Sequence, residues 1–293
     1  MPGPYMLGAF PSPRHLAFAA APHRITGPYP PSFLVVPKQL NIWGNDTYGD
    51  CVSAEEAAAK AMYSVLYGSG TELYIDPATL IAWARKHGYL NGADLTSVMT
   101  SMATDGITVG GVTYRDGPYQ SVDWTNDAVL SSAIFTGPVK LAVKAAQLEA
   151  VHTDSNGWYA DGFHGKLMPS DHCVNLCGYG TVAELYGLMG VPPPPKANLT
   201  ARAYGMFTWG SEGVITATSL KAICDEAWLR APTTVGQNPT PAPVPGPTPS
   251  PGPTPTPTPG PSPSPNGPWA FTMPDGGTLS LYYTPPNPLP PAN

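Results

Sequence analysis

Hydrophobic residues recur at helical spacing along the stretch that follows Cys51, and Gly68 ends the pattern. This periodicity predicts one long helix that begins at Cys51. Weaker patterns predict further helices at about residues 77–87, 94–104 and 126–135, and strands at residues 139–143, 172–177 and 204–208. Because the helices come first and the strands later, the chain is expected to have an α+β fold.

The strand expected at residues 172–177 begins with a histidine and carries two cysteines. Successive side chains on a strand point to opposite faces, so His172 lies on the face opposite to Cys173 and Cys177. Both cysteines are therefore expected to be small buried hydrophobic residues. The same is expected of Cys224, which we place in a helix together with the acidic residues that follow it.

Composition divides the 293-residue chain into four parts. Residues 1–40 are rich in proline and have no period, which predicts an extended arm that lies on the main domain. Residues 41–231 have the composition of a globular domain. Residues 232–268 form a linker with proline at every odd position from 239 to 265, typical of a polyproline II spacer of roughly 80 Å. The sequence of residues 269–293 predicts two short strands.

The two C-terminal parts have alternative roles. The linker is expected to be a passive spacer, and the alternative is a docking site for a proline-binding groove. The tail of residues 269–293 is too short to hold a core alone. It should therefore need a partner surface, either on its own chain or in a larger assembly.

The charge of the chain argues against several classes of partner. A net charge of −6 with only 12% charged residues leaves no basic stripe, so no nucleic-acid partner is expected. No apolar run approaches the roughly 18 to 20 residues of a membrane span. The N-terminal residues lack a basic opening, and the apolar stretch at residues 16–21 is too short to predict a signal peptide.

The spacing of the four cysteines argues against disulfides and metals. Cys173 and Cys177 lie about 13 Å apart along a strand, which is too far for a bridge. No Cys-x-x-Cys pair with a matching second pair occurs, so we expect no structural zinc, and nothing in the sequence indicates a cofactor.

Cys51 and His172 are the candidates for chemistry. A thiol at a helix N-terminus faces unpaired N–H groups and the positive end of the helix dipole, which favour the thiolate. Asp50 opposes this effect with its negative charge. The remaining histidines show no ligand spacing and are expected to be ordinary surface or loop residues: His15, His23, His87, His152 and His164.

Several motifs of residues 41–213 resemble those of the papain-like cysteine peptidases. Asn45 stands six residues before Cys51, where that family has an amide side chain. A Gly-Pro-Val strand begins at Gly137, and a Gly-x-Tyr turn begins at Gly157. His172 then opens a strand that ends in Gly-Tyr-Gly. The resemblance implies a helical subdomain that carries Cys51 at a helix N-terminus, packed on an antiparallel, barrel-like β subdomain that carries His172.

The resemblance also implies a role for each matching residue. Cys51 would attack the scissile carbonyl, and His172 would hold the proton and return it to the leaving amine. The backbone N–H of Cys51 and the side-chain amide of Asn45 would bind the oxyanion. Asn45 replaces a glutamine of the family, so its amide is one methylene closer to the backbone.

The family's motif Asn-Ser-Trp-Gly is replaced by Phe-Thr-Trp-Gly at residues 207–210, so the asparagine that orients the imidazole is missing. Thr208 is the candidate to orient the ring in its place, and Trp209 is the candidate to shield it. Simple alternation along the strand, however, turns Thr208 away from the ring.

Two functions of different class follow. The first is a cysteine peptidase that hydrolyses peptide bonds of a peptide or protein substrate through the Cys51 thiolate and the His172 imidazole. The alternative is a catalytically impaired papain-like domain that serves as a structural or binding module, anchored in an assembly by the linker and tail. The sequence also resembles microbial and phage-type proteins with a Gly-Asn-Asp…Gly-Asp-Cys-Val signature, which favours a virion or cell-surface, extracellular location.

Residues 1–40 contain nothing comparable to the helical inhibitory propeptide of the papain-like family. Latency of the familiar kind is therefore not expected. The sequence leaves open whether this arm crosses the cleft.

Overall fold

The computed structural model describes residues 5–25, 27–68, 72–165, 169–232, 269–272 and 278–281. The chain forms two units, residues 1–243 and residues 244–293. Apart from Pro232, the predicted proline linker lies outside the described residues. In the second unit, β13 (Trp269–Thr272) pairs antiparallel with β14 (Thr278–Leu281). The proposed domain boundaries stay predictions.

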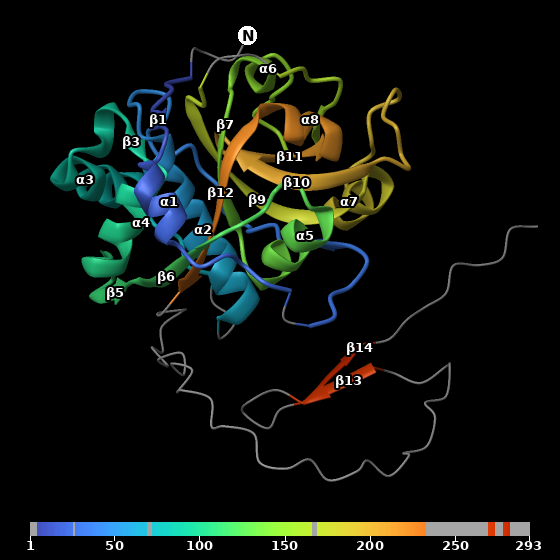
Figure 1. The fold of residues 1–293 in the computed structure, drawn as a ribbon, viewed down its shortest axis with the longest axis horizontal. Coiled ribbons are helices and arrows are strands. Elements are labelled where there is room, and N and C mark those ends of the chain that lie inside the picture. Colours follow the sequence, from blue (N-terminus) through green and yellow to red (C-terminus); the bar gives the residue numbers. More distant parts are fainter. Residues whose placement is uncertain are drawn as a thin grey trace, which may run out of the picture. The chain divides into compact units, whose positions relative to one another are not determined.

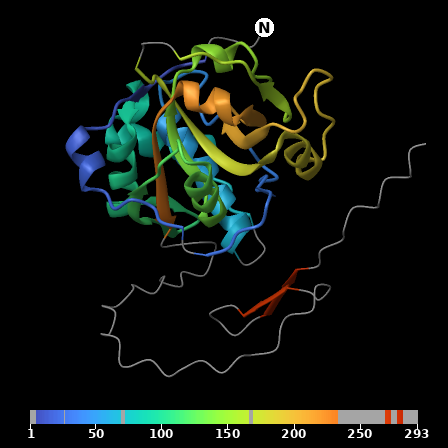
Figure 2. The ribbon, with the colours of Figure 1, turned by 45° about the vertical axis from the view of Figure 1, so that its right-hand side comes forward.

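The helical part of the first unit follows the predicted periodicity. It contains α2 (Cys51–Tyr67), α3 (Pro77–His87), the 3₁₀ helix η1 (Tyr89–Asn91), α4 (Leu95–Thr104), and the hairpin of β4 (Ile107–Val109) and β5 (Val112–Tyr114). Asp76 caps α3 through the Thr79 N–H, and Gly88 ends this helix in the left-handed conformation at φ 80°. Figures 1 and 2 show α2, in light blue, between the helices α3 and α4 and the strands of the sheet.

An eight-stranded sheet forms the other part. Its strand order is β6-β12-β7-β9-β10-β11-β8, with β2 beside β9, and only the β8–β11 pair is parallel. The strands are β2 (Phe33–Leu34), β6 (Asp116–Ser121), β7 (Val139–Val143), β8 (Trp158–Ala160), β9 (His172–Thr181), β10 (Arg202–Thr208), β11 (Ser211–Thr216) and β12 (Cys224–Pro232). The helices around it are α5 (Asp127–Thr136), α6 (Ala146–Glu149), α7 (Val182–Met189) and α8 (Ala217–Ile223). The α+β fold expected from the sequence is therefore present.

Two expectations about local structure were wrong. Cys224 opens the strand β12 and is not in a helix, because it pairs with Val143 of the central strand β7. The N-terminal arm, which was expected to be extended, contains the short helix α1 (Arg14–Ala19). In the sheet part, residues 182–189 form α7. That helix begins with a capping box between Thr181 and Glu184.

The two faces of β9 belong to two hydrophobic cores. Cys173 and Cys177 pack in the core on the α2 side, whereas Val174 and Leu176 pack in the core on the opposite side. The alternation predicted for this strand is therefore correct. Within the described residues, no helix is long and apolar enough to span a membrane.

Six charged side chains are buried together where α2 meets the sheet, and we call them the ion cluster. They are Glu55, Glu56, Lys60, Asp116, Lys140 and Arg230, each at most 4% exposed. Lys140 of β7 donates to Glu55 at 2.5 Å and to Glu56 at 2.7 Å. It also donates to the Val52 carbonyl in the first turn of α2 at 2.9 Å. The cluster therefore fixes the helix turn that carries Cys51 against the sheet.

Candidate active site

Cys51 is the first residue of α2, as the periodicity predicted, and it is 2% exposed. Burial raises the pKa of its thiol to about 12, although the backbone N–H groups of Cys173 and Gly8 act in the opposite direction. The charge of Asp50 raises this pKa further. The helix terminus alone therefore does not produce a thiolate in this arrangement.

Asp50 precedes Cys51 and is 1% exposed. Neither of its carboxylate oxygens has a hydrogen-bond partner that meets normal geometry among the described residues. Burial is the main cause that raises the pKa of this carboxyl to about 7, with a smaller contribution from Asp46. A buried acid next to the thiol therefore titrates near neutral pH.

His172 is the first residue of β9 and is 1% exposed. Its Nε2 lies 2.7 Å from Thr208 Oγ1, and its Nδ1 has no partner among the described residues. Burial lowers the pKa of the imidazole to about 3, and His152 lowers it further. Because Cys173, whose N–H acts on the Cys51 sulfur, follows His172 directly, the thiol and the imidazole lie at the same end of β9.

Thr208 contacts the imidazole, so the expectation that it faces away from the ring was wrong. Phe207 pairs with Asn175 and packs in the core that contains Cys173 and Cys177, and alternation from Phe207 turns Thr208 to the opposite face of the sheet, which carries His172. Phe207, at the position of the family's asparagine, instead packs edge-on against Trp43 at 5.9 Å between ring centroids. The hydroxyl of Thr208 therefore provides the contact to the ring that the missing asparagine would make.

Trp209 packs on one face of the His172 imidazole. Its ring lies 4.2 Å from the His172 ring at an interplanar angle of 16°. Its backbone has a φ of 42°, in the left-handed region, which ends β10 and turns the indole back over the site. Tyr5 of the arm stacks on the opposite face of the indole at 4.3 Å and 13°. The three rings form one stack.

The amide of Asn45 is bound to the arm. Its Nδ2 donates to the Met6 carbonyl at 2.8 Å and to the Tyr48 carbonyl at 3.1 Å, and the Met6 N–H donates to the Asn45 carbonyl at 3.0 Å. The family resemblance assigns the Asn45 amide to the oxyanion. In this structure the amide instead donates to a backbone carbonyl of the arm.

The arm continues across the site from Met6. The N–H groups of Gly8 and Ala9 both donate to the Asp171 carbonyl at 3.0 Å, and the Ala93 N–H donates to the Gly8 carbonyl at 2.8 Å. The strand β1 (Ala9–Phe10) then pairs in parallel with β3 (Ala93–Asp94), and both are labelled in Figure 1. The arm therefore passes directly over Cys51, a point that the sequence left open.

Glycine is needed at position 8 because the arm approaches the Cys51 loop closely. A Cβ atom on Gly8 would lie 1.8 Å from the Gly49 carbonyl oxygen. No side chain fits at this distance unless the arm or the loop moves. Gly27, further along the arm, has no atom within 4 Å of the corresponding position.

Solved structures of cysteine proteases have the same architecture. Procathepsin L2 from Tenebrio molitor larval midgut matches with a TM-score of 0.57 and 16% identity over 78% of each chain. Xylellain, a cysteine protease from Xylella fastidiosa, matches with a TM-score of 0.54 and 12% identity over 78% of this chain and 97% of that one. This chain has a papain-like fold. The ragweed pollen cysteine protease Amb a 11 in its proform gives a TM-score of 0.53 at 12% identity over 74% and 72% of the two chains.

At these identities the papain-like likeness establishes the fold alone. No family model matches the sequence, and no curated protein matches it. Within the described part of the chain, no group of three or more His, Cys, Asp or Glu side chains is arranged to hold a metal ion. All four cysteines are free thiols.

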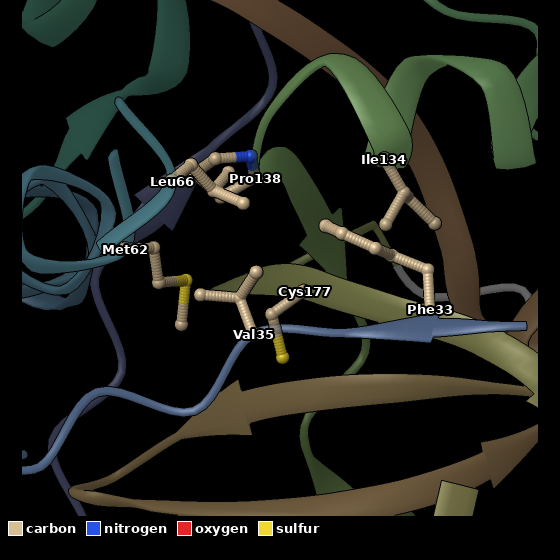
Figure 3. Close-up of a pocket in the computed structure, with 7 residues that line it drawn as sticks. All are labelled: Phe33, Val35, Met62, Leu66, Ile134, Pro138 and Cys177. Carbon is tan, nitrogen blue, oxygen red and sulfur yellow. The ribbon is translucent and has the colours of Figure 1, made fainter. Parts of the chain in front are cut away.

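Cys177 lies away from the thiol–imidazole end of the papain-like domain. It lines a small apolar recess between α2, α5 and the strand β2, which Figure 3 shows. The recess is lined by Phe33, Val35, Met62, Leu66, Ile134, Pro138 and Cys177. Apart from the thiol it contains no titratable side chain, so it offers no second site for acid–base chemistry.

His152 is the functional candidate that the sequence missed, because we expected an ordinary surface or loop residue. It is 4% exposed, and its ring packs edge-on against Trp209 at 5.2 Å. Its partners Tyr5 and Ser211 lie 147 and 59 positions away in the sequence. No local spacing could therefore have indicated it.

Proposed function

We propose that this chain is a cysteine peptidase whose cleft is closed by its own N-terminal arm. Cys51 would be the nucleophile and His172 the acid–base residue once the arm has left. One observation carries the proposal: the Asn45 amide, the Cys51 sulfur and the Asp171 carbonyl all contact the backbone of residues 6–9, which is one continuous stretch of the arm. A groove that binds polypeptide backbone across a thiol is what peptide hydrolysis requires.

The chemistry needs no group beyond these residues and water. The Cys51 proton passes to Nδ1 of His172, and the thiolate attacks the scissile carbonyl carbon. The Asn45 amide and the Cys51 N–H stabilise the oxyanion. As the C–N bond breaks, His172 returns the proton to the leaving amine, and water then hydrolyses the thioester with His172 as the base. Thr208 holds the ring through Nε2.

The direction of the arm supports a blocked state rather than a bound substrate. His172 must reach the leaving nitrogen, so the C-terminal part of a substrate lies on the side of His172 and Trp209. The arm places its N-terminal part there, through Tyr5, and its later residues beside Ala93. It therefore runs opposite to a productive substrate, and its peptide bonds are presented to Cys51 in the wrong orientation.

The electrostatics of the covered site agree with latency. Burial lowers the pKa of His172 to about 3 and raises the pKa of Cys51 to about 12. At neutral pH the proton therefore stays on sulfur and the imidazole stays neutral. Removal of the arm would expose both groups to water and weaken the desolvation that causes both changes.

The alternative function is a catalytically impaired module of an assembly. The filled cleft and the replacement of the orienting asparagine by Phe207 favour it. On this alternative the arm never leaves, and the linker and tail provide the anchor. The two functions differ in one property that can be measured, the reactivity of Cys51 after the arm is displaced.

The experiment uses full-length protein with Gly8→Ala, which introduces a clash with the Gly49 carbonyl, and Gly27→Ala as the matched control in open space. Alkylation of Cys51 by iodoacetamide at pH 7 is followed by mass spectrometry of the labelled peptide. We expect slow labelling in the wild type and in Gly27→Ala. Gly8→Ala should react at least tenfold faster than a free model thiol, and His172→Ala in that background should remove the gain. Labelling of Gly8→Ala no faster than the model thiol would reject the peptidase.

A further inference from the structure

The side chain of Tyr5 packs against Trp209 and His152, and we call the place that it fills the recess. The mechanism does not use it. One face of the Tyr5 ring stacks on Trp209 at 4.3 Å, and its edge meets the His152 ring at 5.2 Å. The Tyr5 hydroxyl lies 2.9 Å from Nδ1 of His152 and 3.3 Å from Asp154 Oδ1, and its single proton can be donated to only one of these acceptors at a time. The recess therefore has an aromatic wall and two acceptors at its end.

The hydrogen bonds around His152 decide which of its nitrogens carries the proton. Ser211 Oγ donates its only proton to the Thr153 carbonyl at 2.6 Å and accepts from the Trp158 indole. It can therefore only accept from Nε2 of His152, which lies 2.9 Å away. Nε2 carries the proton, and Nδ1 is left as an acceptor that points at the Tyr5 hydroxyl.

A neutral His152 keeps this acceptor available. Burial lowers the pKa of the imidazole, which favours the form with one proton. A ring that enters the recess without an O–H group would leave the buried Nδ1 without a donor. An unsatisfied buried acceptor weakens binding by about tenfold or more, so the recess distinguishes a phenol from a phenyl ring.

The position of the recess assigns it to one side of the scissile bond. Trp209 stacks on His172 with one face and on the Tyr5 ring with the other. Because His172 must protonate the leaving nitrogen, a side chain on the far face of Trp209 belongs to the leaving part of the substrate. The residue directly after the scissile bond is the nearest one that can fill this place.

We infer that Trp209, His152 and Asp154 form a subsite for a tyrosine side chain at the residue that follows the scissile bond, and that Tyr5 of the arm fills it in the closed state. The role in substrate choice rests on the proposed function. The binding of a phenol does not, because it depends only on the geometry of the recess.

Binding is tested with full-length Tyr5→Ala, which empties the recess. The probes are p-cresol, which has a donor, and toluene and 4-methylanisole, which have none; affinity is measured by calorimetry. We expect p-cresol to bind Tyr5→Ala at least tenfold more tightly than either other probe, and the wild type to bind none of them at that site. Equal affinities of the three probes, or no binding of p-cresol, would overturn the inference. The comparison between ligands does not require a buried residue to be replaced.

Substrate choice is tested in Gly8→Ala with peptides that differ only in the residue after the scissile bond: tyrosine, phenylalanine or alanine. We expect kcat/KM to be at least tenfold higher for tyrosine than for phenylalanine. Turnover without this preference would overturn the subsite but leave the peptidase intact. Selective p-cresol binding without turnover of any peptide would leave the phenol site standing and reject the peptidase together with the substrate role.

Discussion

The free energy of unfolding of the wild-type protein should decrease between about pH 4 and pH 7 because Asp50 ionises. Replacement of Asp50 by asparagine should abolish this decrease. Asp50 is 1% exposed, and neither of its oxygens has a hydrogen-bond partner of normal geometry among the described residues. Burial raises the pKa of this carboxyl from 3.8 to about 7. Asparagine has nearly the same shape but does not ionise, so it isolates the effect of the charge.

The sign follows from the protons bound in each state. Between pH 3.8 and about 7 the folded protein holds a proton on Asp50 that the unfolded chain has released. Stability from this group is therefore complete below pH 3.8, decreases as the pH rises, and is lost above about pH 7. The pKa of Asp50 is about three units higher in the folded protein, and each unit corresponds to about 1.4 kcal/mol. The free energy of unfolding therefore falls by at most about 4 kcal/mol as the pH rises through this range.

The assay is urea unfolding of the wild type and of Asp50→Asn from pH 4 to pH 8. The two proteins should have similar stability at pH 4, and the variant should be more stable at pH 8 by up to about 4 kcal/mol. Asp46→Asn, at an exposed aspartate in the same loop, is the matched control: it removes only the smaller charge contribution to the pKa of Asp50 and should therefore change the profile much less than Asp50→Asn. Parallel pH profiles of the wild type and Asp50→Asn would show that Asp50 does not ionise from a buried position.

The remaining predictions concern the ion cluster and the imidazole. Lys140→Met leaves the buried carboxylates of the cluster short of a partner and should lower the free energy of unfolding by about 3–5 kcal/mol in urea. Lys144→Met, which removes only the outer pair with Asp225, should cost less than about 1 kcal/mol, and equal losses would contradict the role of the cluster. In the Gly8→Ala background, Thr208→Val should slow alkylation of Cys51 about tenfold while Thr208→Ser retains the rate, because only the hydroxyl holds Nε2 of His172. Equal rates for the two Thr208 variants would exclude an orienting role for the hydroxyl.

The sequence by itself determined the elements whose signals lie within a few residues. The helix that starts at Cys51, the helix Pro77–His87 and the strand Val139–Val143 begin where periodicity, proline and glycine placed them. The opposite faces of β9 also followed from alternation. These features depend on neighbouring side chains and on backbone geometry that repeats every few residues, so a local pattern contains the necessary information.

Only the tertiary structure decided what surrounds the thiol and the imidazole. The register in which β10 pairs with β9 brings Thr208 to the ring, and pairing with β7 makes Cys224 part of a strand. The contact between Tyr5 and His152 joins residues 147 positions apart. Burial, and with it the pKa of each group, depends on segments that are distant in the sequence. Such contacts produce no periodic pattern in the sequence. The candidate nucleophile can therefore be found from the sequence, but the burial, pKa and contacts of the residues around it cannot.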